Sequence, residues 1–532
     1  MKILFSFILT LFILLDSFAQ SSNIYILRTI RFLPVTKLKK ALNLRKSDNL
    51  SIAFEELNLY VLELNNPEKY IPDLNNNPLV DFIEKDEELV LRQTPDDPKY
   101  SEQYALEQIK ASEVWDFTTG GTTYMGDTIV IAVLDDGCNI YHEDLFENIW
   151  VNKMEVPGDS IDNDNNGYID DYHGVNILTK NGIHKSLPHG TKVAGIIGAV
   201  GNNSLGMTGI NWNIKLLPIT DILTKSRIIK GYAYAYKLRK KYNDTNGKQG
   251  AFIVCTNFSG GVDKPEFPED DPRNIAWCEM YDKLGEIGVV SVVSTVNFPR
   301  DVDIEGDMPT LCQSPYLVTV TRTNKNDNFD KEGSAYGKKN VDIAAPGQKI
   351  LSLRPADDYG NGGSGTSYAA PMVSGAIGLM YTVPCKSFIK KAVENPANLA
   401  LEIKEYIMKY SDKHPDLKHK TVSGGRLNIV ESYVNLLEEN CSELDFRDLS
   451  ISQIYPNPAH TMVKIKYETN NYHKHKIIVF NNLGQVVFKE IFRPKPYDVE
   501  EKIIDVSQYA KGIYFFSLIS NKNKVTKRIV VF

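Results

Sequence analysis

The sequence contains little cysteine, and its cysteines form no pattern typical of a metal centre. Among 532 residues there are 6 cysteines and 9 histidines. No CxxC pair and no Cys/His cluster is present, which argues against a zinc site. A chain of this length does not need disulfides to fold, although an exported protein can form them. Cys385 and Cys441 flank one late helical region and are the single pair that we predict.

Long hydrophobic runs are absent after the N-terminus, so we expect no transmembrane span in the mature chain. Near the N-terminus, Lys2 precedes an apolar run from Ile3 to Leu15, and Ser17-Phe18-Ala19 has the small-x-small pattern of a cleavage site. This pattern predicts a signal peptide over residues 1–19 and export of the chain. A membrane anchor is the alternative, but the apolar run is short for a bilayer span.

Strong charge of one sign is also absent, since the net charge is only -7. The charge is uneven, however: residues 451–532 hold thirteen Lys or Arg against six Asp or Glu. The basic residues are scattered between β-patterned residues, which fits a solvated strand face. We therefore interpret the contrast as a domain boundary and expect no nucleic-acid partner.

A continuous apolar, β-branched run from Thr128 to Leu134 predicts a buried parallel strand. The run is followed by Asp135. Functional groups of α/β sheets gather at the carboxyl ends of such strands, so Asp135 is a candidate catalytic acid. The alternative is an acid that only terminates the strand.

Two other polar residues begin helices made of small residues. His189 leads the segment PHGTKVAG, and Ser367 follows the glycine-rich turn 362–365. A helix N-terminus favours negative charge, so Ser367 there is a candidate nucleophile whose own N–H helps to hold an oxyanion. The alternatives are a helix N-cap for Ser367 and a structural role for His189, with His142 as the nearest rival histidine.

The stretch 162–171, with the sequence DNDNNGYIDD, matches the first part of a calcium loop. His173 stands where an EF-hand would place its bidentate Glu, so the remaining ligands must come from elsewhere. The alternative is an Asx-rich surface turn. We predict a structural calcium ion with these candidate ligands: Asp162, Asp164, Asn166, Asp170 and Asp171.

The order Asp…His…Ser is the one that subtilisin uses. The segments 133–137, 189–195 and 365–375 resemble the three signature segments of subtilisin-like serine peptidases. The resemblance implies an α/β fold with a subtilisin-like parallel-sheet peptidase domain over residues 95–440. It also implies hydrolysis of peptide bonds through an acyl-enzyme, with Asp135, His189 and Ser367 as the triad.

Further segments agree with this resemblance. The segment 256–261 resembles the family strand that pairs with substrate, which implies substrate binding at Ser259, Gly260 and Gly261. Asn297 stands where the family places its oxyanion Asn. Two neighbours depart from the family pattern: Asp136 replaces the usual Ser or Thr, and Val296 replaces the usual Gly.

The two ends of the chain carry separate predictions. Residues 20–94 read as a small α+β unit in the place of a propeptide, and an accessory domain is the alternative. Residues 450–532 show alternating strands and turn signals that predict a small β-sandwich. Four segments there resemble the C-terminal sorting domain of type IX secretion in Bacteroidetes, with a substrate- or carbohydrate-binding module as the alternative: 455–458, 482–485, 512–514 and 527–531.

The sequence thus predicts a secreted, calcium-dependent serine endopeptidase. Its expected partners are protein or peptide substrates, its own propeptide and the type IX secretion machinery. Its expected location, after passage through the periplasm, is the cell surface or the extracellular space. Two alternatives stay open: a catalytically silent subtilisin fold that binds partners at the cell surface, and an esterase or peptide ligase that uses the same triad.

Overall fold

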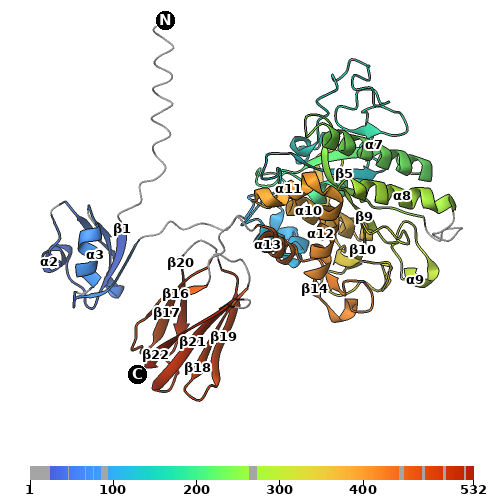
Figure 1. Cartoon of the computed structure of the whole chain (residues 1–532). Helices are drawn as coiled ribbons and strands as arrows, with labels where there is room; N and C mark the ends of the chain where they lie inside the picture. Colours follow the sequence, from blue (N-terminus) through green and yellow to red (C-terminus); the bar gives the residue numbers. More distant parts are fainter. Residues whose placement is uncertain are drawn as a thin grey trace, which may run out of the picture. The chain divides into compact units, whose positions relative to one another are not determined.

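The computed structural model describes residues 24–45, 47–65, 67–75, 77–85, 94–262, 272–441, 449–469, 474–494, 499–520 and 523–532. These residues fall into two compact units that divide between Arg92 and Gln93 (Figure 1). The predicted signal peptide lies outside the described residues. Across the described ranges, no helix combines the length and the apolar character that a bilayer crossing requires.

The first unit is a small α+β fold. Its antiparallel sheet has the strand order β2-β3-β1-β4. Leu27, Leu38, Tyr60 and Leu62 are buried between the sheet and the helices. This is the fold class that the sequence predicts for this segment. The elements are β1 (Ile24–Thr29), α2 (Val35–Ala41), β2 (Asn49–Phe54), η1 (Glu55–Leu57), β3 (Leu59–Glu63), α3 (Pro67–Asn75) and β4 (Val80–Lys85).

The second unit contains a large, mostly parallel sheet. Within the described residues it has nine strands in the order β14-β15-β11-β10-β9-β8-β5-β7-β6. Strand β5 lies inside the sheet, third from the β6 edge, and pairs in parallel with β7 and β8. The strands are β5 (Ile129–Asp135), β6 (Val175–Asn176), β7 (Lys215–Thr220), β8 (Phe252–Phe258), β9 (Val290–Ser294), β10 (Leu317–Thr323), β11 (Ile343–Pro346), β14 (Asp412–Lys413) and β15 (Gly425–Arg426).

Helices cover both faces of this sheet, which explains why β5 is apolar at every position before its final Asp. Ile131 and Val133 pack into one buried cluster together with α6 and α10, whereas Ala132 and Leu134 pack into a second cluster with α7 and α8. A strand buried on both faces has no polar side to alternate with. These helices are α6 (Pro188–Gly198), α7 (Lys225–Asp244), α8 (Pro272–Glu286) and α10 (Thr366–Met380).

The remaining elements of this α/β region complete its core and its loops. They are η2 (Tyr100–Glu102), α4 (Tyr104–Gln108), α5 (Ala111–Val114), η3 (Phe146–Asn148), α9 (Val302–Glu305), β12 (Ile350–Arg354), β13 (Asp358–Gly363), α11 (Lys386–Glu394), α12 (Pro396–Lys409), η4 (Pro415–Leu417) and α13 (Ile429–Asn440).

Two disulfides connect segments of this unit. Cys385 and Cys441 are bonded, as predicted, and join the start of α11 to the end of α13. A second disulfide links Cys278 on α8 to Cys312. The sequence alone did not indicate this second pairing.

The C-terminal part is all-β, as predicted. One antiparallel sheet has the order β16-β17-β20, and the other has the order β19-β18-β21-β22. Inward-facing residues of both sheets, including Ile465 and Phe516, form one buried cluster, so the two sheets make a sandwich. The strands are β16 (Ser450–Tyr455), β17 (Met462–Glu468), β18 (His475–Asn481), β19 (Val486–Phe492), β20 (Val499–Asp505), β21 (Gly512–Ser520) and β22 (Asn523–Val531).

Candidate active site

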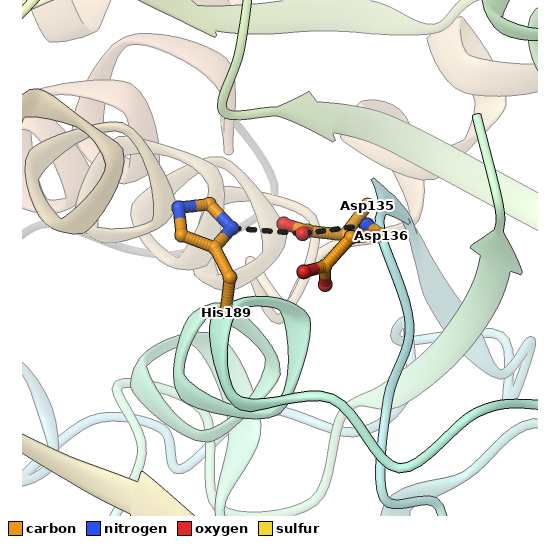
Figure 2. A group of neighbouring side chains, drawn as sticks. All are labelled: Asp135, Asp136 and His189. Atoms are coloured by element: carbon orange, nitrogen blue, oxygen red, sulfur yellow. Dashed lines mark hydrogen bonds and ion pairs between the residues drawn. The ribbon is translucent and has the colours of Figure 1, made fainter. Parts of the chain in front are cut away.

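Asp135 and His189 meet at the carboxyl end of the parallel sheet. Asp135 is the last residue of β5, and His189 is the second residue of α6, after Pro188 at the helix start. The Nδ1 atom of His189 lies 2.8 Å from Oδ1 of Asp135 (Figure 2). The Asp135 side chain is 5% exposed and that of His189 is 34% exposed. The carboxylate is therefore shielded from water while the far edge of the imidazole remains accessible.

The rival histidine, His142, has a different environment. It is fully buried, and its Nδ1 atom accepts a hydrogen bond from the backbone N–H of Asp144. Its Nε2 atom lies 3.3 Å from the backbone oxygen of Asp358. Both ring nitrogens thus contact backbone groups, which fits a structural residue.

A glycine makes the approach of α6 to β5 possible. A Cβ atom at Gly190 would lie 2.0 Å from the backbone oxygen of Gly137 and 2.9 Å from Cβ of Asp135. Neither backbone nor Cβ atoms can yield at such distances. The glycine that follows His189 therefore allows the start of the helix to approach the end of the strand.

Two acids beside His189 control its proton affinity. Burial alone would lower the pKa of His189, but the hydrogen bond and charge of Asp135, joined by the charge of Asp136, raise it overall. The pKa of Asp136 is itself raised, first by burial and then by the charge of Asp135. Asp136 is one of the two residues that depart from the family pattern in the sequence. In the structure its carboxyl group lies next to Asp135 and His189.

Ser367 is the second residue of α10, as the sequence predicts for this helix start. Its N–H is one of the first N–H groups of the helix, which have no carbonyl four residues earlier within the helix to accept them. A Cβ atom at Gly365, two residues earlier, would lie 3.0 Å from Oγ of Ser367, so a larger residue at position 365 would crowd this hydroxyl. Ser367 is 7% exposed.

Asn297 lies beside the same helix start. Its Oδ1 atom accepts a hydrogen bond of 2.8 Å from the backbone N–H of Thr366. The Asn297 side chain is otherwise exposed. The neighbouring Val296 packs against a small apolar cluster, and its N–H donates to Asp307. Val296 thus has a packing role, and Asn297 is still held against α10.

The predicted substrate segment runs on from the carboxyl end of β8. The Oγ atom of Ser259 donates to the backbone oxygen of Ser367 at 3.3 Å, which places this segment beside the helix start. A Cβ atom at Gly261 would lie 2.2 Å from the backbone oxygen of Met308. The structure therefore brings Ser259 and Ser367 together and shows why residue 261 is a glycine.

The acidic loop provides a compact group of carboxylates. Oxygens of Glu155, Asp164 and Asp171 lie within 4.8 Å of one another. Oε1 of Glu155 accepts the N–H of Asp164, whereas its Oε2 is buried and has no hydrogen-bond partner among the described residues. Burial, followed by the charges of neighbouring carboxylates, raises the pKa of Glu155. An orphaned buried oxygen among three acids fits a bound cation.

The other predicted ligands divide into two groups. Asn166 donates to Asp171 at 2.7 Å and so borders the acidic group. Asp162 accepts the N–H groups of Asn166 and Gly167. Asp170 accepts the N–H groups of residues 158 and 160. The carboxylates of Asp162 and Asp170 thus hold the turn itself and lie outside the three-acid group, to which the structure adds Glu155.

A second pair of buried carboxyl groups was not evident from the sequence. Asp97 is 4% exposed and Asp144 is fully buried. Asp144 accepts hydrogen bonds from Asn203 and from the N–H of Met207. Oδ1 of Asp97 is buried, and no residue that the structure describes forms a hydrogen bond with it. Burial and then the charge of Asp97 raise the pKa of Asp144 to about 7. Because these residues are far apart in sequence, only the fold brings them together.

Two protein-family models match parts of this chain. A family model described as the subtilase family matches residues 126–421. The chain belongs to the subtilase family. Members of this family are serine peptidases. A second model, described as a secretion system C-terminal sorting domain, matches residues 453–532. This domain directs secretion of the subtilase to the cell surface or the extracellular space.

Several curated proteins are similar to this subtilase. Subtilisin-like protease 1 of Plasmodium berghei (strain Anka) is 26% identical over 76% of this chain and 64% of its own length. Subtilisin-like protease 1 of Plasmodium falciparum (isolate 3D7) is 29% identical over 50% of this chain and 39% of its own length. The chain thus spans less than two thirds of these Plasmodium relatives.

Thermitase of Thermoactinomyces vulgaris is 29% identical over 57% of this subtilase and 92% of its own length. A solved structure described as proteases from Pseudoalteromonas arctica PAMC 21717 is 23% identical and covers 65% of this chain and 100% of its own, with a TM-score of 0.46.

Proposed function

We propose that this subtilase is a secreted serine endopeptidase in which Asp135, His189 and Ser367 form the triad. The observation that supports this most strongly is the 2.8 Å contact between His189 Nδ1 and Asp135 Oδ1 at the end of β5. The contact fixes the imidazole with Nδ1 toward the acid, which leaves Nε2 as the basic atom. Ser367, at the start of a helix that packs against α6, supplies the hydroxyl.

In this mechanism the Oγ atom of Ser367 attacks the peptide carbonyl carbon. His189 accepts the hydroxyl proton at Nε2 and later donates it to the leaving amine, so that an acyl-enzyme remains on Ser367. Asp135 holds the imidazole and stabilises its protonated form, in keeping with the raised pKa of His189. Water then repeats the same steps on the acyl-enzyme and releases the acid product.

The oxyanion would be held by the N–H of Ser367 and the side-chain amide of Asn297. Because Oδ1 of Asn297 is engaged by the N–H of Thr366, its amide nitrogen is the end left to donate. The extended segment of Ser259, Gly260 and Gly261 would hydrogen-bond the substrate backbone beside Ser367. Its small residues would allow a peptide chain to approach closely.

We also propose that calcium binds at the two clusters of buried carboxylates described above. Glu155, Asp164 and Asp171, with Asn166 at their border, would hold one ion. Asp97 and Asp144 would contribute to a second. In each group a buried carboxylate oxygen lacks a hydrogen-bond partner within the described ranges, and calcium prefers oxygen ligands of this kind. A bound ion would supply structural charge neutralisation and takes no part in the chemistry.

Residues 20–94 would act as a propeptide that is removed from the mature enzyme, after the signal peptide has been cleaved from residues 1–19. The sorting domain would bring the type IX secretion machinery as a partner. The substrates would be proteins or peptides.

A digestion experiment tests the proposed function. Secreted protein, kept in calcium and freed of residues 20–94, would be incubated with casein beside a Ser367→Ala variant. We expect new casein fragments with the wild type and none with the variant. A parallel assay on a simple ester separates the alternatives, because an esterase would cleave the ester alone. A folded wild type that cleaves neither substrate would favour a catalytically silent binding protein.

A further inference from the structure

The Asp135 carboxylate is satisfied on one side only. Its Oδ1 atom accepts two hydrogen bonds of 2.8 Å, one from His189 and one from the backbone N–H of Asp136. Its Oδ2 atom is buried and has no hydrogen-bond partner in the described part of the chain. Burying a carboxylate oxygen without a hydrogen-bond partner costs free energy of folding. The groups beside Oδ2 are therefore candidates for supplying a donor to it.

The group next to Asp135 is the carboxyl of Asp136. One oxygen of each acid and one ring nitrogen of His189 lie within 4.8 Å of one another. The two carboxyl groups stand side by side at the end of the strand (Figure 2). Asp136 is itself held in place, because its Oδ1 atom accepts the N–H of Gly190 at 3.3 Å. A Ser or Thr at this position would offer only a hydroxyl, whereas Asp offers a donor that depends on protonation.

We propose that Asp136 is a positioning residue of the active site, which donates a hydrogen bond to Oδ2 of Asp135 when it is protonated and adds a second negative charge beside His189 when it is ionised. The inference rests on the proposed peptidase function. The proton that Asp136 loses on ionisation passes to solvent. The same side chain therefore orients Asp135 in acid and increases the basicity of His189 at higher pH.

Other charged and titratable groups border this pair, and they shape the response. Lys192, on the same helix as His189, opposes the two acids, because its charge lowers the pKa of His189. Tyr368 of α10 lies with its ring centroid 6.4 Å from that of His189, and burial raises its pKa. Cys138 is a buried thiol whose pKa is also raised by burial. Asp221, whose N–H contacts the backbone oxygen of Asp136, is neutralised by Lys185 and Arg227.

Three variants separate the two roles of Asp136. Asp136→Ser keeps a donor and removes the charge, so the acid limb of the pH–rate profile should move to lower pH by about half a unit or more. Asp136→Ala removes the charge and the donor, so we expect the same shift and also a limiting rate about threefold or more below that of the Ser variant. Lys192→Met removes a positive charge, and its acid limb should move to higher pH.

The experiment measures the rate of inactivation by a fluorophosphonate probe between pH 4 and pH 9 (about the range that His titration requires), with calcium present and with the melting temperature as a check of folding. This labelling assay requires no knowledge of the preferred substrate. We expect the acid limbs of Asp136→Ser and Lys192→Met to shift in opposite directions. We also expect Asp136→Ala to react with the probe more slowly than Asp136→Ser.

Two outcomes would overturn the proposal in distinguishable ways. Profiles of folded Asp136→Ser and wild type that superimpose, with Ser367 labelled in both, would overturn the role of Asp136 and leave the peptidase function standing. Wild type that is never labelled at Ser367 at any pH would overturn the peptidase function, and the role of Asp136 with it.

Discussion

Asn297 and Thr366 are joined by a 2.8 Å hydrogen bond from the Thr366 N–H to Oδ1 of Asn297. The Thr366 hydroxyl lies 3.2 Å from the same oxygen. The N–H of Thr366 thus fixes which end of the amide faces the helix. The remaining amide nitrogen is pre-oriented beside Ser367, which is the property an oxyanion donor needs.

The first prediction concerns this amide. Asn297→Ala should lower the rate of peptide hydrolysis by about 10²–10³, because one donor to the oxyanion is lost. Stability should change little, since the Asn297 side chain is exposed. Casein digestion and the melting temperature measure the two effects. Asn213→Ala, at another exposed Asn of the same unit, is the control and should leave both unchanged; equal digestion rates for Asn297→Ala and wild type would exclude the oxyanion role.

The second prediction concerns pH. A base must be neutral to accept a proton, so activity should fall as the pH drops through the pKa of His189, which lies above the ordinary value of 6.5. The contribution of protonated His189 to folding stability has the opposite pH dependence. It is full below the pKa that His189 has in the unfolded state, and it is lost as the pH rises through the higher pKa of the folded state.

Asp135→Asn removes the partner that raises this pKa, so the acid limb should move to lower pH and the rate should fall by several orders of magnitude. A pH–rate profile of wild type and variant measures both effects. An acid limb for Asp135→Asn at the same pH as for wild type would show that His189 is not the titrating base.

The third prediction concerns the contact between α6 and β5. Gly190→Ala should abolish most activity and lower the melting temperature, because its Cβ would collide with the Gly137 backbone and with Asp135. Gly512→Ala is the matched control, since a Cβ there meets nothing within 4 Å. Normal digestion by the Gly190→Ala variant would contradict the close packing that brings His189 to Asp135.

The fourth prediction concerns calcium. Removing calcium with a chelator should lower the melting temperature, and a ligand held at about 100 times its dissociation constant stabilises the fold by roughly 2.7 kcal/mol. Glu155→Gln should reduce the calcium-dependent part of the stability, because it removes the charge of the acid with the orphaned oxygen.

The control for calcium is Glu147→Gln, which alters an exposed acid outside both carboxyl groups. Its melting temperature should respond to the chelator as that of the wild type does. An identical melting temperature of wild type with and without chelator would count against both calcium sites.

The sequence predicted those features of the site that depend on local patterns. The apolar run before Asp135, the glycine turn before Ser367 and the small residues after His189 each determine one element and its end. The pairing of Cys385 with Cys441 was predicted from their places around one helical region, and the structure confirms it.

Features that depend on packing between distant segments could not be predicted from local sequence patterns. Glu155 lies outside the acidic motif, and only the folded loop brings it to Asp164. Asp97 and Asp144 approach through the turn that follows α6. The link between Asn297 and Thr366 likewise requires β9 and α10 to be placed side by side, which no local pattern determines.

Covalent labelling of Ser367 tests the proposed peptidase function most directly. Secreted protein in calcium-containing buffer, freed of residues 20–94, would be treated with a fluorophosphonate probe, and the adduct would be located by mass spectrometry beside a Ser367→Ala control. We expect an adduct on Ser367 that is absent from the control. A folded wild type without an adduct on Ser367 would contradict it.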